Sequence, residues 1–459
     1  MKKFFNNFKH VFIDNKIFLA LFTLSIVALL PWILAFWPAN MSPDSLTQWV
    51  QATTFRYTDL HPYIFSVFVS FLAAIWKSPA SLIIFQILVF SITIAYFFQS
   101  LLKKSANKFL VYASFALLVT FIPIDLYNVT FWSDVLYSYL IMLVSLIFVK
   151  QCFDHAEGKK PTVKSLIYVA FLILMIAFFR HNGILYVLLF PVIYYLYKLI
   201  DLKKALIVLS VLVAVTLLQM TLFSHLLNVS NDSALLQEIP KAKVIGLALK
   251  DGVSYDKNDK DFLLRLAPAS TWSNYVCYND YSLFWDNNFD KTYLSKPSSL
   301  TEWNHIFWET VLHRPDILVK DRACLDFNLL GGQNLYFLGI TKNQVGLTQT
   351  PPSISINKVM TGLVNWSFEK PQRYLIWTPG IFVLIYFAFA VYSLKKKLYF
   401  SLGYVILNLA NAIPILVIVS SAEYRYLYSI IPSLFLLPAI ISAESLLRQR
   451  KNKEKVING

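Results

Sequence analysis

The sequence is poor in charge, because only 15% of its 459 residues are Asp, Glu, Lys or Arg, against about 25% in a typical soluble domain. In place of charge it has repeated apolar runs of about 20 residues, the length that crosses a lipid bilayer. These two features exclude a soluble globular protein. Cysteine is also scarce: three Cys exclude a disulfide scaffold and a multi-Cys metal cluster, and leave room for one disulfide.

The charge that is present is mostly positive, with a formal net charge of +15. A basic balance can indicate nucleic-acid binding, but a membrane protein acquires the same excess by keeping Lys and Arg in its cytoplasmic loops. We therefore expect the lipid bilayer to be the surrounding of this chain, and no nucleic acid to be a partner.

Ten apolar runs reach membrane-spanning length. They cover residues 17–38, 79–102, 108–126, 133–150, 165–180, 183–198, 205–225, 374–394, 398–420 and 427–447. If each run crosses once, the basic clusters at 103–108, 159–164, 203–204, 395–397 and 448–455 all fall on one side. Because Lys and Arg concentrate on the cytoplasmic side, we expect an all-α, multi-pass cell-membrane protein with both termini cytoplasmic.

Two outer segments interrupt this pattern. In the first outer loop, residues 39–78, the apolar run Pro62 to Trp76 is too short to cross and is predicted to lie on the surface as a helix. The second, 226–372, holds 14 Lys and Arg and 15 Asp and Glu, so its net charge is −1 while the rest carries +16. The predicted parts are a transmembrane module that contains the first outer loop (1–225), a mostly helical extracytoplasmic domain (226–372), and C-terminal transmembrane helices with a basic tail (373–459).

The outer domain contains two of the three cysteines. Cys277 and Cys324 lie on the predicted oxidising side, whereas Cys152 is predicted to be cytoplasmic and free. For Cys277 and Cys324 the sequence leaves two outcomes open, a disulfide or two separate thiols.

Most ionisable residues outside the basic loops fall at predicted outer ends of spans, where a charge is costly and usually marks function or a packed ion pair. They are Asp44, Arg56, Asp59, His61, Asp125, Asp134, Arg180, His181, Glu423 and Arg425. Their common side predicts a polar site at the outer leaflet.

The first outer loop has the most specific pattern. Asp44 follows a Pro and precedes a helix-like segment, so one interpretation is a helix N-cap. Asp59 and His61 precede Pro62, which is suited to open a second helix. Two helix starts in one loop would bring two carboxylates and an imidazole to one surface.

These residues carry a family resemblance. Ser42-Pro43-Asp44-Ser45 with Gln48, then Asp59-Leu60-His61-Pro62 before a surface helix, resembles the first loop of GT-C fold membrane glycosyltransferases, in particular a bacterial subgroup. The resemblance implies an enzyme that moves a sugar from a polyprenyl-phosphate donor to a cell-envelope glycan or lipid-linked acceptor. It also implies that the loop-one Asp is the general base and that the active site is extracytoplasmic.

Three later stretches fit the same family, and each has a structural alternative. Asp134 stands at the outer start of the fourth span, where similar sequences also carry a carboxylate. Phe179-Arg180-His181-Asn182-Gly183 breaks a helical pair, and the alternative is a polar turn with Gly as the helix C-cap. Ala422-Glu423-Tyr424-Arg425-Tyr426 precedes the last span, and the alternative is an interfacial aromatic belt with a local ion pair.

The chemistry of sugar transfer assigns the roles. Asp44 or Asp59 would take the acceptor proton, with Asp134 as a further catalytic carboxylate. Arg180 and Arg425 would hold the donor phosphate, because Arg suits bidentate phosphate contact. One displacement would invert the anomeric centre, whereas two nearby carboxylates leave a covalent route open. The remaining substrate-binding candidates are Gln48, Tyr57, His61, His181 and Glu423.

A metal is left open. Asp44, Asp59, Asp134 and His61 could assemble a site for Mn²⁺ or Mg²⁺, but the sequence shows no fixed ligand spacing. Three other histidines are weaker candidates for a functional role: His225, His305 and His313.

Two other functions compete with the enzyme. A transporter or flippase of lipid-linked glycans would also need an outer polar cavity, but the inner halves of the spans are almost free of charge. A sensor or scaffold would use the outer domain for binding. The sugar and the acceptor cannot be read from the sequence.

Overall fold

The computed structural model describes residues 15–104, 106–331 and 351–458. These residues form helices joined by turns and loops, and no β-strand occurs among them beyond isolated bridges such as Asn40 with Thr130. The all-α prediction is confirmed for this part of the chain.

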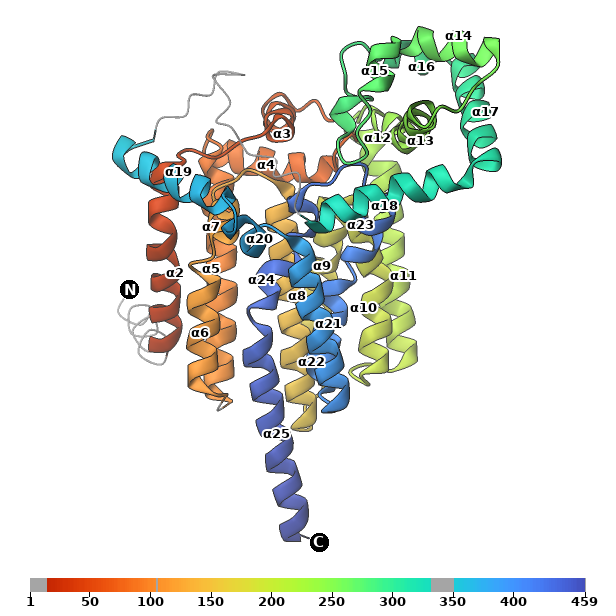
Figure 1. Cartoon of the computed structure of the whole chain (residues 1–459). Helices are drawn as coiled ribbons and strands as arrows, with labels where there is room; N and C mark the ends of the chain where they lie inside the picture. Colours follow the sequence, from red (N-terminus) through yellow and green to blue (C-terminus); the bar gives the residue numbers. More distant parts are fainter. Residues whose placement is uncertain (1–14, 105, 332–350, 459) are drawn as a thin grey trace.

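The N-terminal half supplies most of a helical bundle (Figure 1). Its elements are α2 (Lys16–Ala35), α3 (Pro43–Thr54), α4 (Tyr63–Ile75), α5 (Ala80–Lys103), α6 (Lys108–Leu118), α7 (Ile122–Asn128), α8 (Ser133–Ala156), α9 (Val163–Phe179), η1 (His181–Gly183), α10 (Ile184–Leu196), α11 (Leu202–Leu218), η2 (Gln219–Phe223) and α12 (Ser224–Leu226). After the outer domain the chain returns to the bundle. The returning elements are α19 (Ile354–Phe368), α20 (Gln372–Ile376), α21 (Pro379–Lys395), α22 (Tyr399–Leu409), α23 (Ala412–Ile418), η5 (Tyr424–Leu427), α24 (Ile430–Leu434) and α25 (Leu437–Asn458).

Six helical stretches of the described residues are long and apolar enough to cross a membrane. They are Lys16–Ala35, Ala80–Lys103, Ser133–Ala156, Leu202–Leu226, Tyr399–Ile418 and Tyr424–Lys453. The pair α6 and α7, bent by 55°, would make a seventh. Three more of the predicted runs form shorter apolar helices, α9, the η1–α10 stretch and α21. The chain is therefore a helical membrane protein, while the count of ten spans stays a prediction.

The basic clusters meet at one end of the bundle. Lys104 Nζ donates to Glu157 Oε1 at 2.8 Å, which joins the end of α5 to the end of α8. Arg448 Nη1 donates to the Lys396 carbonyl at 2.5 Å, which joins α25 to the end of α21. In Figure 1, α25 leaves the bundle at the end opposite the outer domain. The loops that the sequence assigns to one side therefore share one end of the structure.

The opposite end is covered by short helices. The run Pro62 to Trp76 forms α4, which lies across the bundle rather than along it (Figure 1). It buries Phe65 and Val69 in the bundle core and leaves Ile75 85% exposed. This amphipathic arrangement is typical of a helix at a membrane surface.

The outer domain has its own apolar core, centred on Phe284, Leu294 and Trp303. Its elements are η3 (Ser233–Glu238), α13 (Ile239–Lys250), α14 (Lys257–Leu266), α15 (Ala269–Ser273), η4 (Asp280–Ser282), α16 (Lys291–Leu294), α17 (Pro297–His313) and α18 (Pro315–Gly331). Helix α19 belongs elsewhere: Met360 and Val364 join the bundle core, and Asn357 Nδ2 donates to the Ala35 carbonyl of α2 at 2.7 Å. The outer segment thus divides between a separate core and the bundle.

Candidate active site

Asp44 lies in the first turn of α3 but does not cap the helix. Ser42 is the N-cap residue: its hydroxyl accepts the Ser45 N–H, and the Ser45 hydroxyl accepts the Ser42 N–H. Pro43 occupies the first helical position, where its fixed φ favours a helix start. The interpretation of Asp44 as an N-cap is therefore wrong, because the serine two positions earlier satisfies the backbone donors.

Two basic side chains from other elements meet the Asp44 carboxylate. Arg425 Nη1 lies 2.6 Å from Asp44 Oδ2, and His61 Nε2 lies 3.6 Å from Asp44 Oδ1. The exposed fraction of the Asp44 side chain is 21%, against 12% for Arg425. The ion pair is thus mostly withdrawn from solvent, while part of the Asp44 side chain remains accessible.

Arg425 is held by more than Asp44. Its Nε lies 2.5 Å from Glu423 Oε2, and its guanidinium lies over the Trp132 ring, 4.9 Å from the centroid. The Trp132 indole N–H donates to Ser42 Oγ at 2.8 Å, so the same ring is tied to the start of α3. An arginine with two carboxylate contacts and an aromatic platform has a fixed orientation.

A second ion pair lies beside the first. Arg180, at the end of α9, pairs with Asp134 in the first turn of α8. The Cζ atoms of Arg180 and Arg425 each lie 5.3 Å from the centroid of the Tyr426 ring. The two guanidinium groups therefore share one aromatic side chain. We refer to Asp44, His61, Asp134, Arg180, Glu423 and Arg425 as the Asp44 cluster.

The two carboxylates that share Arg425 have pKa values shifted in opposite directions. Burial alone would raise the pKa of Asp44, but the Arg425 guanidinium and the hydrogen bond to His61 outweigh burial and hold that pKa well below its ordinary value. Burial raises the pKa of Glu423, and the attraction of Arg425 offsets only part of the rise. Asp44 thus stays ionised, while Glu423 takes up a proton more readily. Such a separation of neighbouring carboxyl pKa values is common in catalytic sites.

Asp59 anchors the outer segment. Its Oδ1 accepts the Asp232 N–H at 2.6 Å, and its own N–H donates to the Ser230 carbonyl at 3.0 Å. Tyr57 contributes to the same junction, since its carbonyl accepts the Ser230 N–H and its hydroxyl pairs with Ser70 Oγ, both at 3.0 Å. Asp59 and Tyr57 therefore join the first loop to the start of the outer domain.

Two other predicted substrate residues, Gln48 and His181, lie close in sequence to members of the cluster. Gln48 lies one turn after Asp44 on α3 and is 2% exposed, and its Oε1 accepts no hydrogen bond within the described part of the chain. His181 is exposed on η1 and hydrogen-bonds to the Asp59 backbone. Gln48 is the more informative of the two, because a buried amide oxygen without a donor is costly in a folded protein.

Gly183 is required for close packing. One interpretation of the sequence was a polar turn with Gly183 as the helix C-cap. The C-cap residue of α9 is instead Arg180, and Gly183, with φ −64°, ends the short η1 helix, so the C-cap interpretation is wrong. A Cβ at this position would collide with the Ile176 carbonyl of α9. Only glycine permits the close approach of α9 and η1 that positions Arg180.

The outer domain holds the segment that leads to Glu423. Lys243 Nζ of α13 donates to the Ser420 carbonyl at 2.6 Å, and Ser420 Oγ donates to Asp280 Oδ2 at 3.1 Å. The Ala422 N–H donates to the Tyr278 carbonyl at 3.0 Å. Hydrogen bonds from the outer domain therefore hold residues 420–422 in place. We call these contacts the clamp; they lie immediately before Glu423 and Arg425 of the Asp44 cluster.

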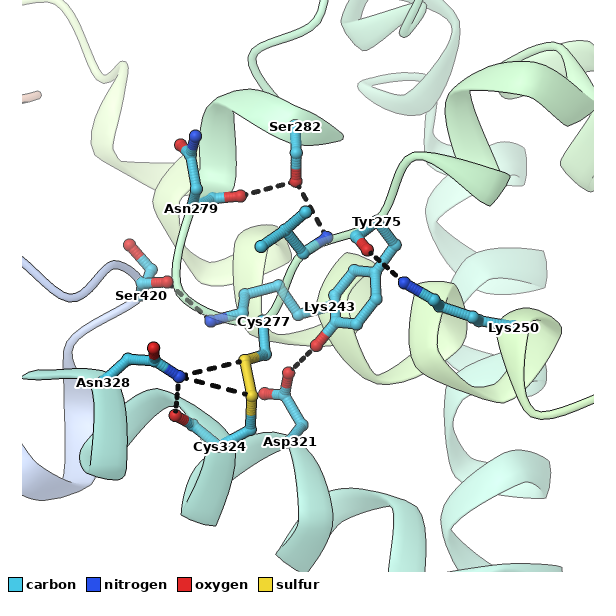
Figure 2. Close-up of a disulfide and its surroundings, with 11 residues drawn as sticks. Lys243, Lys250, Tyr275, Cys277, Asn279, Ser282, Asp321, Cys324, Asn328 and Ser420 are labelled. Carbon is cyan, nitrogen blue, oxygen red and sulfur yellow. Dashed lines mark hydrogen bonds between the residues drawn. A yellow bond between two sulfur atoms is a disulfide. The ribbon is translucent and has the colours of Figure 1, made fainter. Parts of the chain in front are cut away.

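A disulfide fixes this clamp. Cys277 in the 274–279 loop is bonded to Cys324 of α18, with a Cα–Cα distance of 6.1 Å (Figure 2). Tyr275 in the same loop donates its hydroxyl to Asp321 of α18, as Figure 2 also shows. Burial lowers the pKa of Lys243 to about 8, although the nearby Asp321 and Asp280 favour its charged form. Of the two outcomes that the sequence left open for the cysteines, the structure has the disulfide.

The suggested Mn²⁺ or Mg²⁺ ligands are not gathered into one site. Asp44 pairs with Arg425, Asp134 pairs with Arg180, and Asp59 accepts a backbone N–H. Among the described residues, the group whose ligand atoms lie close enough to hold a metal is Asp259, His305 and Glu309. It lies in the outer domain and shares no residue with the Asp44 cluster.

Sequence reasoning missed Trp132, Tyr426 and Lys243. Tyr426 directly follows Arg425, and Trp132 stands two residues before Asp134. An aromatic close to an outer-end Arg or Asp is the signal that could have identified them as cation–π partners. Lys243 gave no such signal. Its role depends on a contact between α13 and a segment near the C-terminus.

Comparisons with protein-family models, curated proteins and solved structures gave no significant match. The resemblance to GT-C enzymes therefore rests on the first-loop motifs, the three later stretches around Asp134, Arg180 and Arg425, and the expected membrane topology.

Proposed function

We propose that the chain is a GT-C type membrane glycosyltransferase that transfers a sugar from a polyprenyl-phosphate donor to a glycan or lipid-linked acceptor. The observation that supports this most directly is the ion pair between Asp44 and Arg425. It brings a carboxylate suited to act as base against a guanidinium suited to bind phosphate, at one end of an apolar bundle.

The ion pair suggests an order of events. Before the donor binds, Arg425 neutralises Asp44 and keeps its pKa low, so Asp44 is a weak base. A donor phosphate would compete with Asp44 for Arg425, because Arg binds phosphate in the same bidentate way. Once Arg425 turns to the phosphate, the pKa of Asp44 rises towards its ordinary value. The base is then activated only when the donor is present.

The transfer itself is a single displacement. The acceptor hydroxyl oxygen attacks the anomeric carbon, the bond from that carbon to the phosphate oxygen breaks, and Asp44 takes the hydroxyl proton. Polyprenyl phosphate leaves with an added negative charge, which Arg425 and Arg180 stabilise. One base on the face opposite the leaving group gives inversion at the anomeric centre. Gln48 Oε1, which accepts no hydrogen bond from the residues that the structure describes, would accept one from a substrate hydroxyl.

The proposed topology has ten spans in the cell membrane, with both termini in the cytoplasm and the Asp44 cluster outside. The shorter helices α9, α10 and α21 complete the ten in this arrangement. Arg180 and Arg425 would then lie near the outer leaflet, where the phosphate of a membrane-embedded prenyl donor resides.

The test is a transfer assay with purified full-length protein and a synthetic short-chain polyprenyl-phosphate sugar. A nucleotide sugar serves as the competing donor, and an EDTA arm tests whether Mn²⁺ or Mg²⁺ is required, since either ion would have to displace Arg425 from Asp44. We expect sugar release from the lipid donor alone, and loss of release in Asp44→Asn. If lipid-linked glycan instead crosses reconstituted vesicles while neither donor is turned over, the protein is a flippase.

A further inference from the structure

The outer domain contains a second cluster of titratable side chains. Glu302, His305 and Glu309 follow one another at spacings of three and four residues along α17, so they lie on one face of that helix. Asp259, in the first turn of α14, approaches the same face. The two helices are fixed relative to each other because Phe262 of α14 and Trp303 of α17 belong to the same apolar core.

The ligand atoms of this cluster are close together. One atom each from Asp259, His305 and Glu309 lies within 4.8 Å of the others, and His305 Nδ1 is 3.8 Å from Glu309 Oε2. Around a tetrahedral zinc ion, ligand atoms at about 2.0–2.1 Å from the metal are about 3.3 Å apart. The His305 and Glu309 side chains are 66% and 45% exposed, so small side-chain rotations can close the difference.

Asp259 indicates that the cluster lacks a cation. Its exposed fraction is only 5%, yet no Lys, Arg or N–H group within the described residues pairs with its carboxylate. Its neighbours are the acidic Asp256, Glu302 and Glu309, and the Glu302 side chain is hydrogen-bonded to the Asp259 carboxyl group. A buried carboxylate surrounded by other carboxylates is costly unless a positive charge joins it.

We propose that Asp259, His305 and Glu309 bind a first-row divalent transition metal such as Zn²⁺, with Glu302 in reach as a fourth ligand. The imidazole decides the class of metal, because nitrogen suits Zn²⁺ and its neighbours in the series, whereas Mg²⁺ and Ca²⁺ prefer oxygen alone. The bound ion would neutralise Asp259 and join α14 to α17. This site is independent of the proposed transferase chemistry.

The experiment uses metal-stripped full-length protein in detergent, titrated with Zn²⁺ and with Mg²⁺ by calorimetry and by thermal unfolding. We expect one Zn²⁺ per chain with a rise in unfolding temperature, and no comparable effect of Mg²⁺. Loss of outer-shell groups typically costs 10–100-fold in metal affinity, so loss of a direct ligand in His305→Gln or Asp259→Asn should cost roughly 100-fold or more. The matched controls are His225→Gln and Asp261→Asn, which change exposed residues outside the cluster.

The Asp259→Asn variant also distinguishes loss of a metal ligand from misfolding as the cause of weaker Zn²⁺ binding. It removes one of the crowded negative charges, so the metal-free variant should unfold at or above the temperature of metal-free wild type while failing to respond to Zn²⁺. The proposal is overturned if wild type binds no Zn²⁺, or if His305→Gln and Asp259→Asn bind Zn²⁺ as tightly as the two controls.

Discussion

Arg425 and Asp44 form an ion pair across nearly the whole length of the chain, with Arg425 Nη1 2.6 Å from Asp44 Oδ2. Asp44 lies in α3 of the first outer loop, and Arg425 lies in the short helix η5 that precedes the final helices. The pair therefore joins the first outer loop to the segment before the final helices, and it lowers the pKa of Asp44.

Asp44→Asn should separate catalysis from folding. Asn has the same size and still accepts a hydrogen bond from Arg425, but it cannot take up a proton at neutral pH. Because Ser42 makes the helix cap, α3 should remain intact. We expect turnover of the lipid donor to fall by roughly 10²-fold or more, the contribution typical of a general base. Asp261→Asn is the control, and turnover near wild type in Asp44→Asn would remove Asp44 from the role of base.

Arg425→Lys tests the guanidinium rather than the charge. Lys keeps one positive charge but loses the planar fork that reaches both Asp44 and Glu423. Loss of a hydrogen bond to a charged group costs about 1.5–3 kcal/mol, or roughly 10- to 150-fold in kcat/KM, which we expect for Arg425→Ala. Arg425→Lys should retain only part of the kcat/KM that Arg425→Ala loses. Full recovery by Lys would show that a point charge is sufficient.

Reduction of the Cys277–Cys324 disulfide should loosen the clamp on residues 420–422. The bond closes a loop over a sequence separation of 47 residues, and for a loop of that size the chain-entropy model gives about 4 kcal/mol of stabilisation. We expect reductant to lower the unfolding temperature of wild type and to leave a Cys277→Ala/Cys324→Ala variant unchanged. An equal response of both proteins would assign the effect to something other than this disulfide.

Lys243 should give the outer domain a dependence of stability on alkaline pH. Its pKa of about 8 in the folded protein is below the ordinary 10.5, so between these values the unfolded chain binds more protons than the folded one. Below pH 8 the folded state bears the full free-energy cost of burying the charged Lys243 side chain. This cost falls as the pH rises to 10.5, so the folded state becomes more stable. The difference corresponds to about 3 kcal/mol at most.

Lys243→Met removes that titration. Thermal unfolding of wild type and Lys243→Met between pH 7 and 10.5 should show the two curves converging as pH rises, after correction for the lost hydrogen bond to Ser420. Parallel curves across this range would mean that Lys243 titrates normally.

The topology is testable by labelling. In intact cells, a thiol reagent that cannot cross the membrane should modify Asp290→Cys and spare Lys159→Cys in an otherwise Cys-free chain. Permeabilised cells provide the control, since both positions should then react. Modification of position 159 in intact cells would reverse the proposed orientation.

The sequence by itself determined the membrane class, the location of the apolar helices and the end of the bundle at which the polar residues gather. These features can be read from local sequence. A lipid-exposed helix must be apolar over its own length, and the Lys and Arg content of a loop does not depend on which helices pack beside it. The surface position of α4 follows in the same way from a run that is too short to cross.

Only the tertiary structure decided which charges pair. Both arginines and both carboxylates of the two ion pairs were visible in the sequence, but the partner of each depends on how α3, α8, η1 and η5 meet at the end of the bundle. The same holds for the second carboxylate of the first loop, Asp59, which accepts the Asp232 N–H, and for Lys243, which reaches Ser420. Such contacts join residues far apart in sequence, and no local pattern of periodicity or spacing encodes them.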